Sequence, residues 1–497
     1  HAYADLFALV EQTPSISATQ PDEPSSPSSP SSPGDDLGLD GVNLGLDGKS
    51  NKPSDQKPTV GTPPHRQILE RLGVLVIGHV EGTDTIVGFS KIKCRTFFIK
   101  DINRLKIENL LMHVGPHCEE LIHTGGEPDG RVTLNQVKRA FAKESGMRPI
   151  NDSNQLGVGI WELGKRLVMV GSDEVVIVNG DITSSKVPEL NNKLLDFSGG
   201  EPWFNLEHVK DLYAQSADQK WCEGVFTDAM EIFGRWDNWL HEDCPELVTA
   251  LVCCSWIQTT WDYRPAVCVT GGANTGKTMF MEECLKRMFG PEMSLFTSKP
   301  TEAGVRQAIG HTAKIVLIDE FEHDRHRQQI LNLFRSSTRG TDILRGTTGH
   351  KAQTFHLCHI PWVSAIETGL KSEADRSRYI ILDLKPIPKG RPSRLTLPNV
   401  EQLRELGNRL MIVAMRNWER AKWLSGVLKG KSFGDVDRRV IESYSVPVGM
   451  LAAVCGMNDA EATEALKLIL GRRNFAEDHE SDEEALVRDI LESNVRL

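Results

Sequence analysis

Residues 271–278 constrain this chain more than any other segment. They read Gly-Gly-Ala-Asn-Thr-Gly-Lys-Thr, which fits the phosphate-loop pattern G-x-x-x-x-G-K-[ST]. An apolar run at 266–270 precedes the motif, and Phe280, Cys284 and Met288 follow it at helical spacing. We therefore expect a buried strand, a glycine-rich loop and a helix in that order, with the helix N-terminus directed at phosphate. This order of elements predicts an α/β fold.

The motif also predicts a site for ATP and Mg²⁺. In this pattern the backbone N–H groups of the loop surround the phosphates, the Lys277 ammonium reaches the β and γ oxygens, and the Thr278 hydroxyl holds Mg²⁺. An ordinary glycine-rich turn is the alternative, which the flanking strand and helix disfavour. The predicted nucleotide-binding residues of the loop are Gly271, Gly272, Ala273, Asn274, Thr275, Gly276, Lys277 and Thr278.

A second apolar run, at 314–318, ends in the carboxylates Asp319 and Glu320. This pattern predicts a Walker B segment on a neighbouring strand of the same sheet. Asp319 would orient Mg²⁺ through its water shell, and Glu320 would polarise the attacking water. Two solvated carboxylates at a strand end are the alternative.

Three segments carry a resemblance to a known family. The phosphate loop, an Asp-Glu pair about forty residues later and an arginine before a later apolar strand resemble superfamily 3 helicases of the AAA+ class. Residues 301–307, 319–322 and 373–378 resemble the helicase part of phage and plasmid primase-helicases, and the likeness spans about 200–385. The resemblance implies a replicative DNA helicase. Such an enzyme moves on single-stranded DNA at replication forks as a homo-oligomeric ring, expected to be a hexamer.

The same resemblance assigns an arginine finger. Arg378 precedes the apolar run 379–382 and is the first candidate to reach the γ-phosphate held by a neighbouring subunit; Arg376 is the second. A guanidinium suits this role because its charge is permanent and its planar fork matches phosphate oxygens. The alternative is a surface arginine paired with Asp375 or Glu373.

One position departs from the family pattern. The third motif of the family ends an apolar strand with an asparagine that senses the γ-phosphate, whereas the run here is 362–368 and Glu367 falls nearest the expected position. An ionised carboxylate cannot donate a hydrogen bond. Glu367 is kept as a nucleotide-binding candidate, with Ser364 as the alternative donor.

Residues 344–355 carry turn glycines between extended-type segments and read as a β-hairpin. The corresponding hairpin of superfamily 3 rings projects into the central channel and contacts DNA. By that resemblance Arg345, His350 and Lys351 would contact the phosphate backbone. A solvated loop with incidental charge is the alternative.

Composition limits how the chain can meet nucleic acid. It has 57 Lys and Arg against 68 Asp and Glu, for a formal charge of -11. A polybasic membrane or chromatin binder is therefore disfavoured, and DNA must meet a local patch, such as hairpins that converge in a ring. The ten cysteines form no C-x-x-C pair, so we expect reduced thiols and no structural zinc. Without a membrane-spanning run or a signal peptide pattern, we expect a cytoplasmic protein.

Five segments are expected along the chain. Residues 1–12 carry an amphipathic stripe, interpreted as the remnant of an upstream domain, which would be a primase-polymerase in the resembled family; an unstructured remnant is the alternative. The others are a disordered linker at 13–66, an α+β accessory domain at 67–198, the ATPase domain at 199–385 and a C-terminal helical bundle at 386–497.

Two details and two functional alternatives stay open. Trp161, beside the basic pair Lys165 and Arg166, could stack on a base, although a core position is favoured. The tryptophans of 200–264 are interpreted as buried. A signalling or defence ATPase could use the same phosphate loop as a switch that assembles without unwinding DNA. A packaging motor, which would prefer duplex DNA, is a third possibility.

Overall fold

The computed structural model describes residues 64–473, apart from short gaps. The predicted remnant at 1–12 and the predicted linker up to residue 63 lie outside the described residues, as does everything after 473. At 123, 149, 189, 342, 344–346 and 352–354 the backbone is described without the side chains. The internal gaps are 81–82, 94, 124–130, 147–148, 151–154, 173, 187–188, 191–192, 197–200, 322–325, 347–351, 367, 369, 371 and 388–394.

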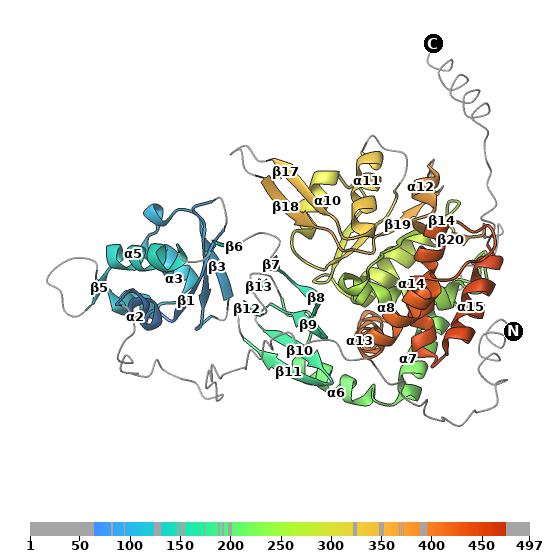
Figure 1. Ribbon diagram of the computed structural model, residues 1–497, viewed down its shortest axis with the longest axis horizontal. Coiled ribbons are helices and arrows are strands. Elements are labelled where there is room, and N and C mark those ends of the chain that lie inside the picture. Colours follow the sequence, from blue (N-terminus) through green and yellow to red (C-terminus); the bar gives the residue numbers. More distant parts are fainter. Residues whose placement is uncertain are drawn as a thin grey trace, which may run out of the picture.

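The first unit is a small α+β body at the far end of the molecule from the large sheet (Figure 1). It begins with a helix at Pro64, inside the segment predicted as linker. Its sheet has the order β3-β2-β1-β6, and helices α2 and α5 pack together beside it through Leu69, Val137 and Phe141. The elements are α2 (Pro64–Arg71), β1 (Val74–Val80), β2 (Ile86–Ser90), β3 (Arg95–Ile99), η1 (Ile102–Arg104), α3 (Ile107–His113), α4 (His117–Leu121), β4 (Ile122–His123), β5 (Val132–Thr133), α5 (Leu134–Ser145) and β6 (Pro149–Ile150).

The second part is an antiparallel meander with the order β11-β10-β9-β8. Trp161 lies in it, is 7% exposed and donates from Nε1 to the Gly157 carbonyl at 2.8 Å, so the core interpretation of this residue is confirmed. Ile160 and Met169 of the meander share one hydrophobic core with the helices that follow. The strands of the meander are β8 (Gly159–Leu163), β9 (Arg166–Val170), β10 (Val175–Asn179) and β11 (Asp181–Ser185). A separate three-stranded sheet has the order β12-β13-β7 and consists of β7 (Gln155–Leu156), β12 (Glu189–Leu190) and β13 (Lys193–Leu195).

A five-stranded parallel sheet forms the centre of the region predicted to be the ATPase domain, with the order β15-β16-β19-β14-β20. Its central strands are buried throughout, which matches their uninterrupted apolar sequences. The two predicted strands at 266–270 and 314–318 are confirmed, but they are not neighbours, because β19 lies between them. The strands are β14 (Ala266–Gly271), β15 (Ser294–Thr297), β16 (Ile315–Ile318), β19 (Trp362–Ala365) and β20 (Tyr379–Leu384).

Helices surround this sheet, and the predicted hairpin stands beside it (Figure 1). Helix α8 is buried along its whole length and contacts α7, α13 and α14, so the C-terminal helices and the region of the parallel sheet share one core. The predicted C-terminal helices are confirmed up to residue 471. The elements are α6 (Leu206–Gln215), α7 (Gln219–Phe233), α8 (Cys244–Trp256), η3 (Gln258–Thr260), η4 (Met279–Leu285), α9 (Lys286–Phe289), α10 (Glu302–Ile309), α11 (Arg327–Thr338), β17 (Asp342–Gly346), β18 (Ala352–His356), α12 (Glu373–Arg376), α13 (Val400–Lys429), α14 (Arg438–Val454) and α15 (Asp459–Gly471).

The cysteines serve packing. The nine described cysteines are all buried and free, and burial raises the pKa of thiols such as Cys222, to about 11. The described residues contain no group of three or more His, Cys, Asp and Glu side chains that could hold a metal ion. Among the described helices, none combines the length and the apolar character that crossing a membrane requires.

Candidate functional site: a phosphate loop at one sheet edge and arginines at the other

The phosphate loop leaves the sheet at the carboxyl end of β14 and requires glycine at two positions. Gly271 has φ 149°, and a Cβ there would lie 2.7 Å from the Leu384 carbonyl oxygen of the adjacent strand. Gly276 has φ 94°, and a Cβ there would lie 3.0 Å from Nε1 of Trp236. Both the conformation and the space exclude other residues. The glycines of the motif are thus accounted for by the local backbone.

The side chains of the loop bond to its own backbone. Lys277 donates from Nζ to the Gly271 carbonyl at 2.5 Å and to the Gly272 carbonyl at 2.9 Å. Thr275 is buried and donates to the Gly272 carbonyl at 3.0 Å. Thr278 is exposed in the first turn of the helix that follows. The loop therefore holds an ammonium group, a hydroxyl and a helix N-terminus together, which fits the phosphates and Mg²⁺ of a nucleotide.

Two residues upstream of the motif hold the loop from outside. Trp236 donates from Nε1 to the Gly276 carbonyl at 3.3 Å, and its ring meets Phe280 edge-on at 5.3 Å. Asn238 donates from Nδ2 to the Thr275 carbonyl at 3.2 Å and to the Lys385 carbonyl at 2.9 Å. The sequence identified Trp236 as a buried residue, which is confirmed, but not its contact with the loop.

The helix after the loop is not a regular α-helix. Residues Met279–Leu285 form a π-helix, in which the Lys286 N–H donates to the Met281 carbonyl. Phe280, Cys284 and Met288 are buried, as their spacing predicted. A π segment is rare and often marks a functional site.

Asp319 and Ser364 form the second part of the site. Asp319 directly follows β16, is 4% exposed and accepts a hydrogen bond from the Ser364 hydroxyl. Ser364 lies on β19, the strand inserted between β16 and β14. Because its hydroxyl donates to Asp319, Ser364 orients the carboxylate that was predicted to hold Mg²⁺. The sequence offered Ser364 only as the alternative sensor of the γ-phosphate.

Glu320 has an unusual backbone. Its φ is 54°, and among the described residues the one other non-glycine residue with positive φ is Asn274 of the phosphate loop, at 61°. Asparagine tolerates this region, whereas glutamate rarely adopts it. The Glu320 N–H approaches the Ser364 hydroxyl at 3.4 Å, and the Phe321 N–H donates to the Ser364 carbonyl at 2.7 Å. Backbone strain of this kind costs on the order of 1–3 kcal/mol and gathers at functional sites. Here it turns the exposed Glu320 side chain out of the strand.

Arg378 lies at the opposite edge of the sheet. It immediately precedes β20, which pairs with β14 in parallel register from Tyr379 opposite Ala266 to Leu384 opposite Gly271. Five residue steps along a strand span roughly 17 Å. Phosphate bound at Gly271 of the same chain is thus beyond the reach of the Arg378 side chain.

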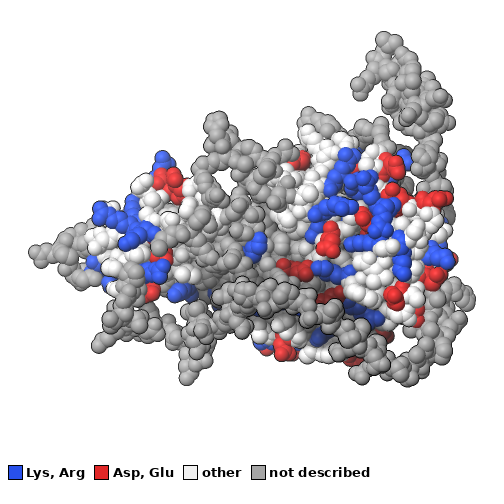
Figure 2. Space-filling model, in the orientation of Figure 1, with Lys and Arg blue, Asp and Glu red and all other residues white. Residues whose placement is uncertain are grey.

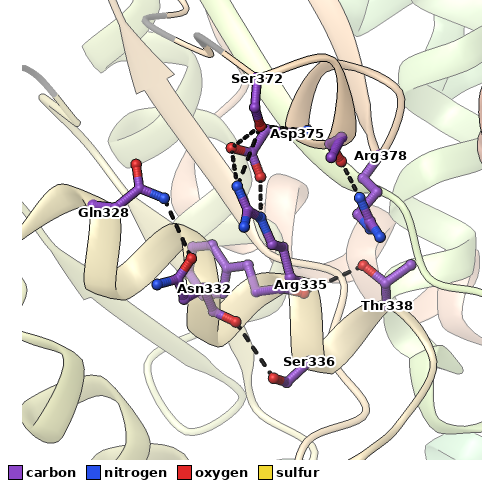
Figure 3. A network of polar contacts seen from close by, with 10 residues as sticks. Gln328, Asn332, Arg335, Ser336, Thr338, Ser372, Asp375 and Arg378 are labelled. Carbon is purple, nitrogen blue, oxygen red and sulfur yellow. Dashed lines mark hydrogen bonds and ion pairs between the residues drawn. The ribbon is translucent and has the colours of Figure 1, made fainter.

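An ion pair that the sequence did not reveal organises this second edge. Arg335 reaches from α11 to Asp375, with Nε to Oδ1 at 2.5 Å and Nη2 to Oδ2 at 2.6 Å, and it also bonds Ser372 at 3.2 Å (Figure 3). Burial alone would raise the pKa of Asp375, but the hydrogen bonds from Arg335 and Ser372 outweigh it, so this pKa is lowered. The alternative in which Asp375 forms an ion pair with Arg376 or Arg378 is wrong, because its partner is Arg335.

The two finger candidates are held by the backbone. Arg378 is half-buried and donates to the Ala374 carbonyl, and Arg376 donates from Nε to the Leu370 carbonyl at 2.8 Å. Burial lowers the pKa of Arg378, and the nearby Arg439 and Arg335 lower it further. Lys and Arg side chains gather in this region of α11 and α12 (Figure 2). Three guanidinium groups near one another favour an anionic partner.

The hairpin is confirmed as an antiparallel pair, β17 and β18, in register from Asp342 opposite His356 to Gly346 opposite Ala352. Its base is anchored because Phe355 is buried beneath the Arg306 guanidinium, 4.4 Å from the ring centroid. Arg306 belongs to the resemblance segment 301–307, so part of that motif supports the hairpin.

Several predicted residues cannot be placed. His350, Lys351 and Glu367 lie outside the described residues, and Arg345 lies on β17 without a described side chain. The DNA contacts of the hairpin and the sensor role of Glu367 therefore stay predictions.

Comparison with known proteins finds similar solved structures but no similar family model or curated sequence. No family model and no curated protein sequence matches the chain. Among solved structures, the A form apo structure of the NrS-1 C-terminal region is 12% identical, covers 82% of this chain and 73% of its own, and has a TM-score of 0.38. A second apo structure of that region has the same identity and TM-score, with 74% of its chain covered. A TM-score this low establishes neither a shared fold nor a function.

Proposed function

We propose that the chain is an ATP hydrolase that moves along single-stranded DNA as a homo-oligomeric ring, expected to be a hexamer, and unwinds replication forks. The observation that carries the proposal is the division of the site between two sheet edges. The phosphate loop and the Asp319–Glu320 pair lie at the carboxyl edge, and Arg378 lies at the amino edge. A complete site of this kind would need a second copy of the chain.

Each residue of the carboxyl edge has a role in hydrolysis that its contacts support. Lys277 would neutralise phosphate charge, and Glu320 would accept the proton of the attacking water. Thr278 and Asp319 would hold Mg²⁺, which supplies Lewis-acid charge neutralisation when bound. Ser364 keeps the Asp319 carboxylate oriented, and Trp236 and Asn238 keep the loop in place. This arrangement favours turnover over simple nucleotide storage, because the catalytic carboxylate is positioned at the cost of backbone strain.

Two features support the DNA part of the proposal. They are the resemblance of 301–307, 319–322 and 373–378 to superfamily 3 helicases and the hairpin anchored by Arg306. A ring would bring several hairpins to one channel, so a chain of net charge -11 could still bind a DNA strand.

Strand displacement tests the proposal directly. The chain is mixed with a labelled DNA fork and ATP, and release of the labelled strand is followed together with phosphate release. We expect unwinding and faster hydrolysis when single-stranded DNA is present. The Lys277→Ala variant, which should bind no nucleotide, is the negative control. Slow hydrolysis that DNA does not stimulate, with no strand released, would favour a signalling or defence ATPase that assembles as a switch. A preference for duplex over single strands in the stimulation assay would favour a packaging motor.

A further inference from the structure

The N-terminal unit differs in charge from the rest of the chain. Residues 64–150 contain 13 Lys and Arg against 10 Asp and Glu, while the whole chain has a formal charge of -11. Figure 2 shows Lys and Arg prominent on the visible surface of this unit. None of the sequence motifs assigns this unit a role, and an excess of cations on a small body within an acidic chain favours an anionic partner.

Helix α5 concentrates this charge on one exposed ridge. Asn135, Arg139 and Lys143 are all exposed and follow one another at intervals of four residues, which places them in one row on the helix surface. Arg139 and Lys143 have no ion-pair or hydrogen-bond partner among the described residues. By contrast, Lys138 is turned away and donates to the Asn103 carbonyl at 2.6 Å.

The acidic residue of α5 does not offset this charge. Glu144 lies on another side of the helix, where it bonds His65 at 3.0 Å and Arg66 at 2.9 Å on α2. These contacts fix α5 against α2, and Val137, Ala140 and Phe141 bury its inner face. The helix is also capped at Thr133, whose side chain accepts from the Gln136 N–H. The cationic ridge therefore stands on a rigid helix.

We propose that α5 docks in the major groove of duplex DNA. The ridge spans about 12 Å, since its ends are eight residues apart at a rise of 1.5 Å, and the major groove is also about 12 Å wide. Arg139 and Lys143 supply cations for phosphates or guanine edges, and Asn135 is the residue type that pairs with adenine. The surface is distinct from the phosphate loop and from the hairpin.

The described residues of this unit disfavour other partners. None of its described Phe side chains is exposed, so it lacks the stacking platform that a single strand would use. The α5 ridge carries no large apolar side chain, which a membrane-bound helix would need. Duplex RNA is a poor fit because its major groove is too deep and narrow for side chains to read.

A DNA-binding experiment with the full chain tests this proposal. The ligand is a blunt DNA duplex of about two helical turns, and binding is followed by fluorescence anisotropy over a range of salt concentrations. The Arg139→Ala/Lys143→Ala variant should bind duplex roughly tenfold more weakly, and its slope of log affinity against log salt should flatten by about 1.8, from about 0.9 per lost contact. The matched control is Lys220→Ala/Lys431→Ala, which removes two exposed lysines elsewhere and should bind as the parent does.

Three outcomes would overturn the proposal. Unchanged duplex affinity and salt slope in the double variant would remove α5 from the DNA path. An equal loss of affinity for single-stranded DNA in the double variant would contradict a duplex site. If the parent protein bound duplex RNA as tightly as duplex DNA, docking in the major groove would be contradicted. Nucleotide hydrolysis should be unchanged in the double variant. A failure of the α5 proposal can therefore be distinguished from a failure of the ATPase assignment. Charge-preserving exchange, Arg139→Lys/Lys143→Arg, should restore most of the affinity.

Discussion

The two edges of the parallel sheet are constructed in different ways. At the carboxyl edge, backbone conformation determines the shape of the site, because Gly271, Gly276, Asn274 and Glu320 all have positive φ within two short loops. At the amino edge, charged side chains determine the structure, since the bidentate Arg335–Asp375 pair lies beside Arg378. The first edge has the loop that we propose binds phosphate, and the other presents guanidinium groups.

The two edges differ in how far each depends on a second subunit. A loop that is shaped by its own backbone can bind phosphate without help from a second subunit. A guanidinium about 17 Å away along the strand can act on that phosphate only if another copy brings it there. Nucleotide binding should therefore belong to the single chain, and hydrolysis to the assembly.

The largest expected effects come from two substitutions at the carboxyl edge that should differ in kind. Lys277→Ala should abolish nucleotide binding because it removes the ammonium that meets the phosphates. Glu320→Gln should keep binding but lower turnover by about 10² to 10⁴, the usual worth of a general base. Fluorescent-nucleotide titration and phosphate release measure the two effects. The control is Lys286→Ala, in the helical segment that follows the phosphate loop, because Lys286 forms its ion pair with Glu282. Parental turnover in Glu320→Gln would show that another group activates the water.

The next largest effect is expected from Arg378→Ala, which changes the amino edge and leaves the phosphate loop intact. Arg378→Ala should bind nucleotide normally and hydrolyse it about 10³-fold more slowly, the lower end of the range for arginine fingers. Mixing it with Lys277→Ala subunits should restore some activity, because an intact loop then meets an intact Arg378. Arg438→Ala, which removes an exposed arginine at the first residue of α14, should have little effect. Co-assembly without rescue would transfer the role to another residue, with Arg376 tested next.

Local patterns in the sequence predicted the local parts of the site well. The strand, loop and helix around 271–278 and the strand before Asp319 were all found where expected, because a buried parallel strand must be apolar and a tight loop must contain glycine. The hairpin was found for the same reason, since its turn residues are adjacent in the chain.

The missed features depend on residues far apart in the chain. Ser364 meets Asp319 from 45 residues away because β19 is inserted between β16 and β14, and strand order is not written in any one segment. Arg335 and Asp375 are 40 residues apart and come from different helices. The π-helix was also missed, since burial of Phe280 and Cys284 fits an α-helix equally well.

A smaller effect should follow from loosening the amino edge without removing its finger. Arg335→Ala removes the ion pair that holds the α12 turn, so Arg378 should lose its position while its charge stays. We expect roughly a tenfold loss of kcat with an unchanged KM, as for a positioning residue whose contact matters in the transition state. Asp375→Asn should act in the same direction, and a double variant should cost little more than either single one. Additive losses would show that the two residues act separately.

The smallest effect concerns Glu246, which lies at neither edge of the sheet. It shows how burial, without a catalytic role, changes the pKa of a carboxyl group. It is 3% exposed in the first turn of α8, and burial raises its pKa from 4.5 to about 7. Between these two values the unfolded chain releases the proton and the folded chain keeps it, so stability falls as the pH rises from 4.5 through about 7. Glu246→Gln cannot ionise and should escape this loss, which amounts to about 3 kcal/mol by pH 8. Thermal unfolding at pH 5 and pH 8 measures it, with the exposed Glu242→Gln as control. If parent and Glu246→Gln lose equal stability over that range, the α8 carboxyl is ionised in the folded protein, and burial alone does not set its charge.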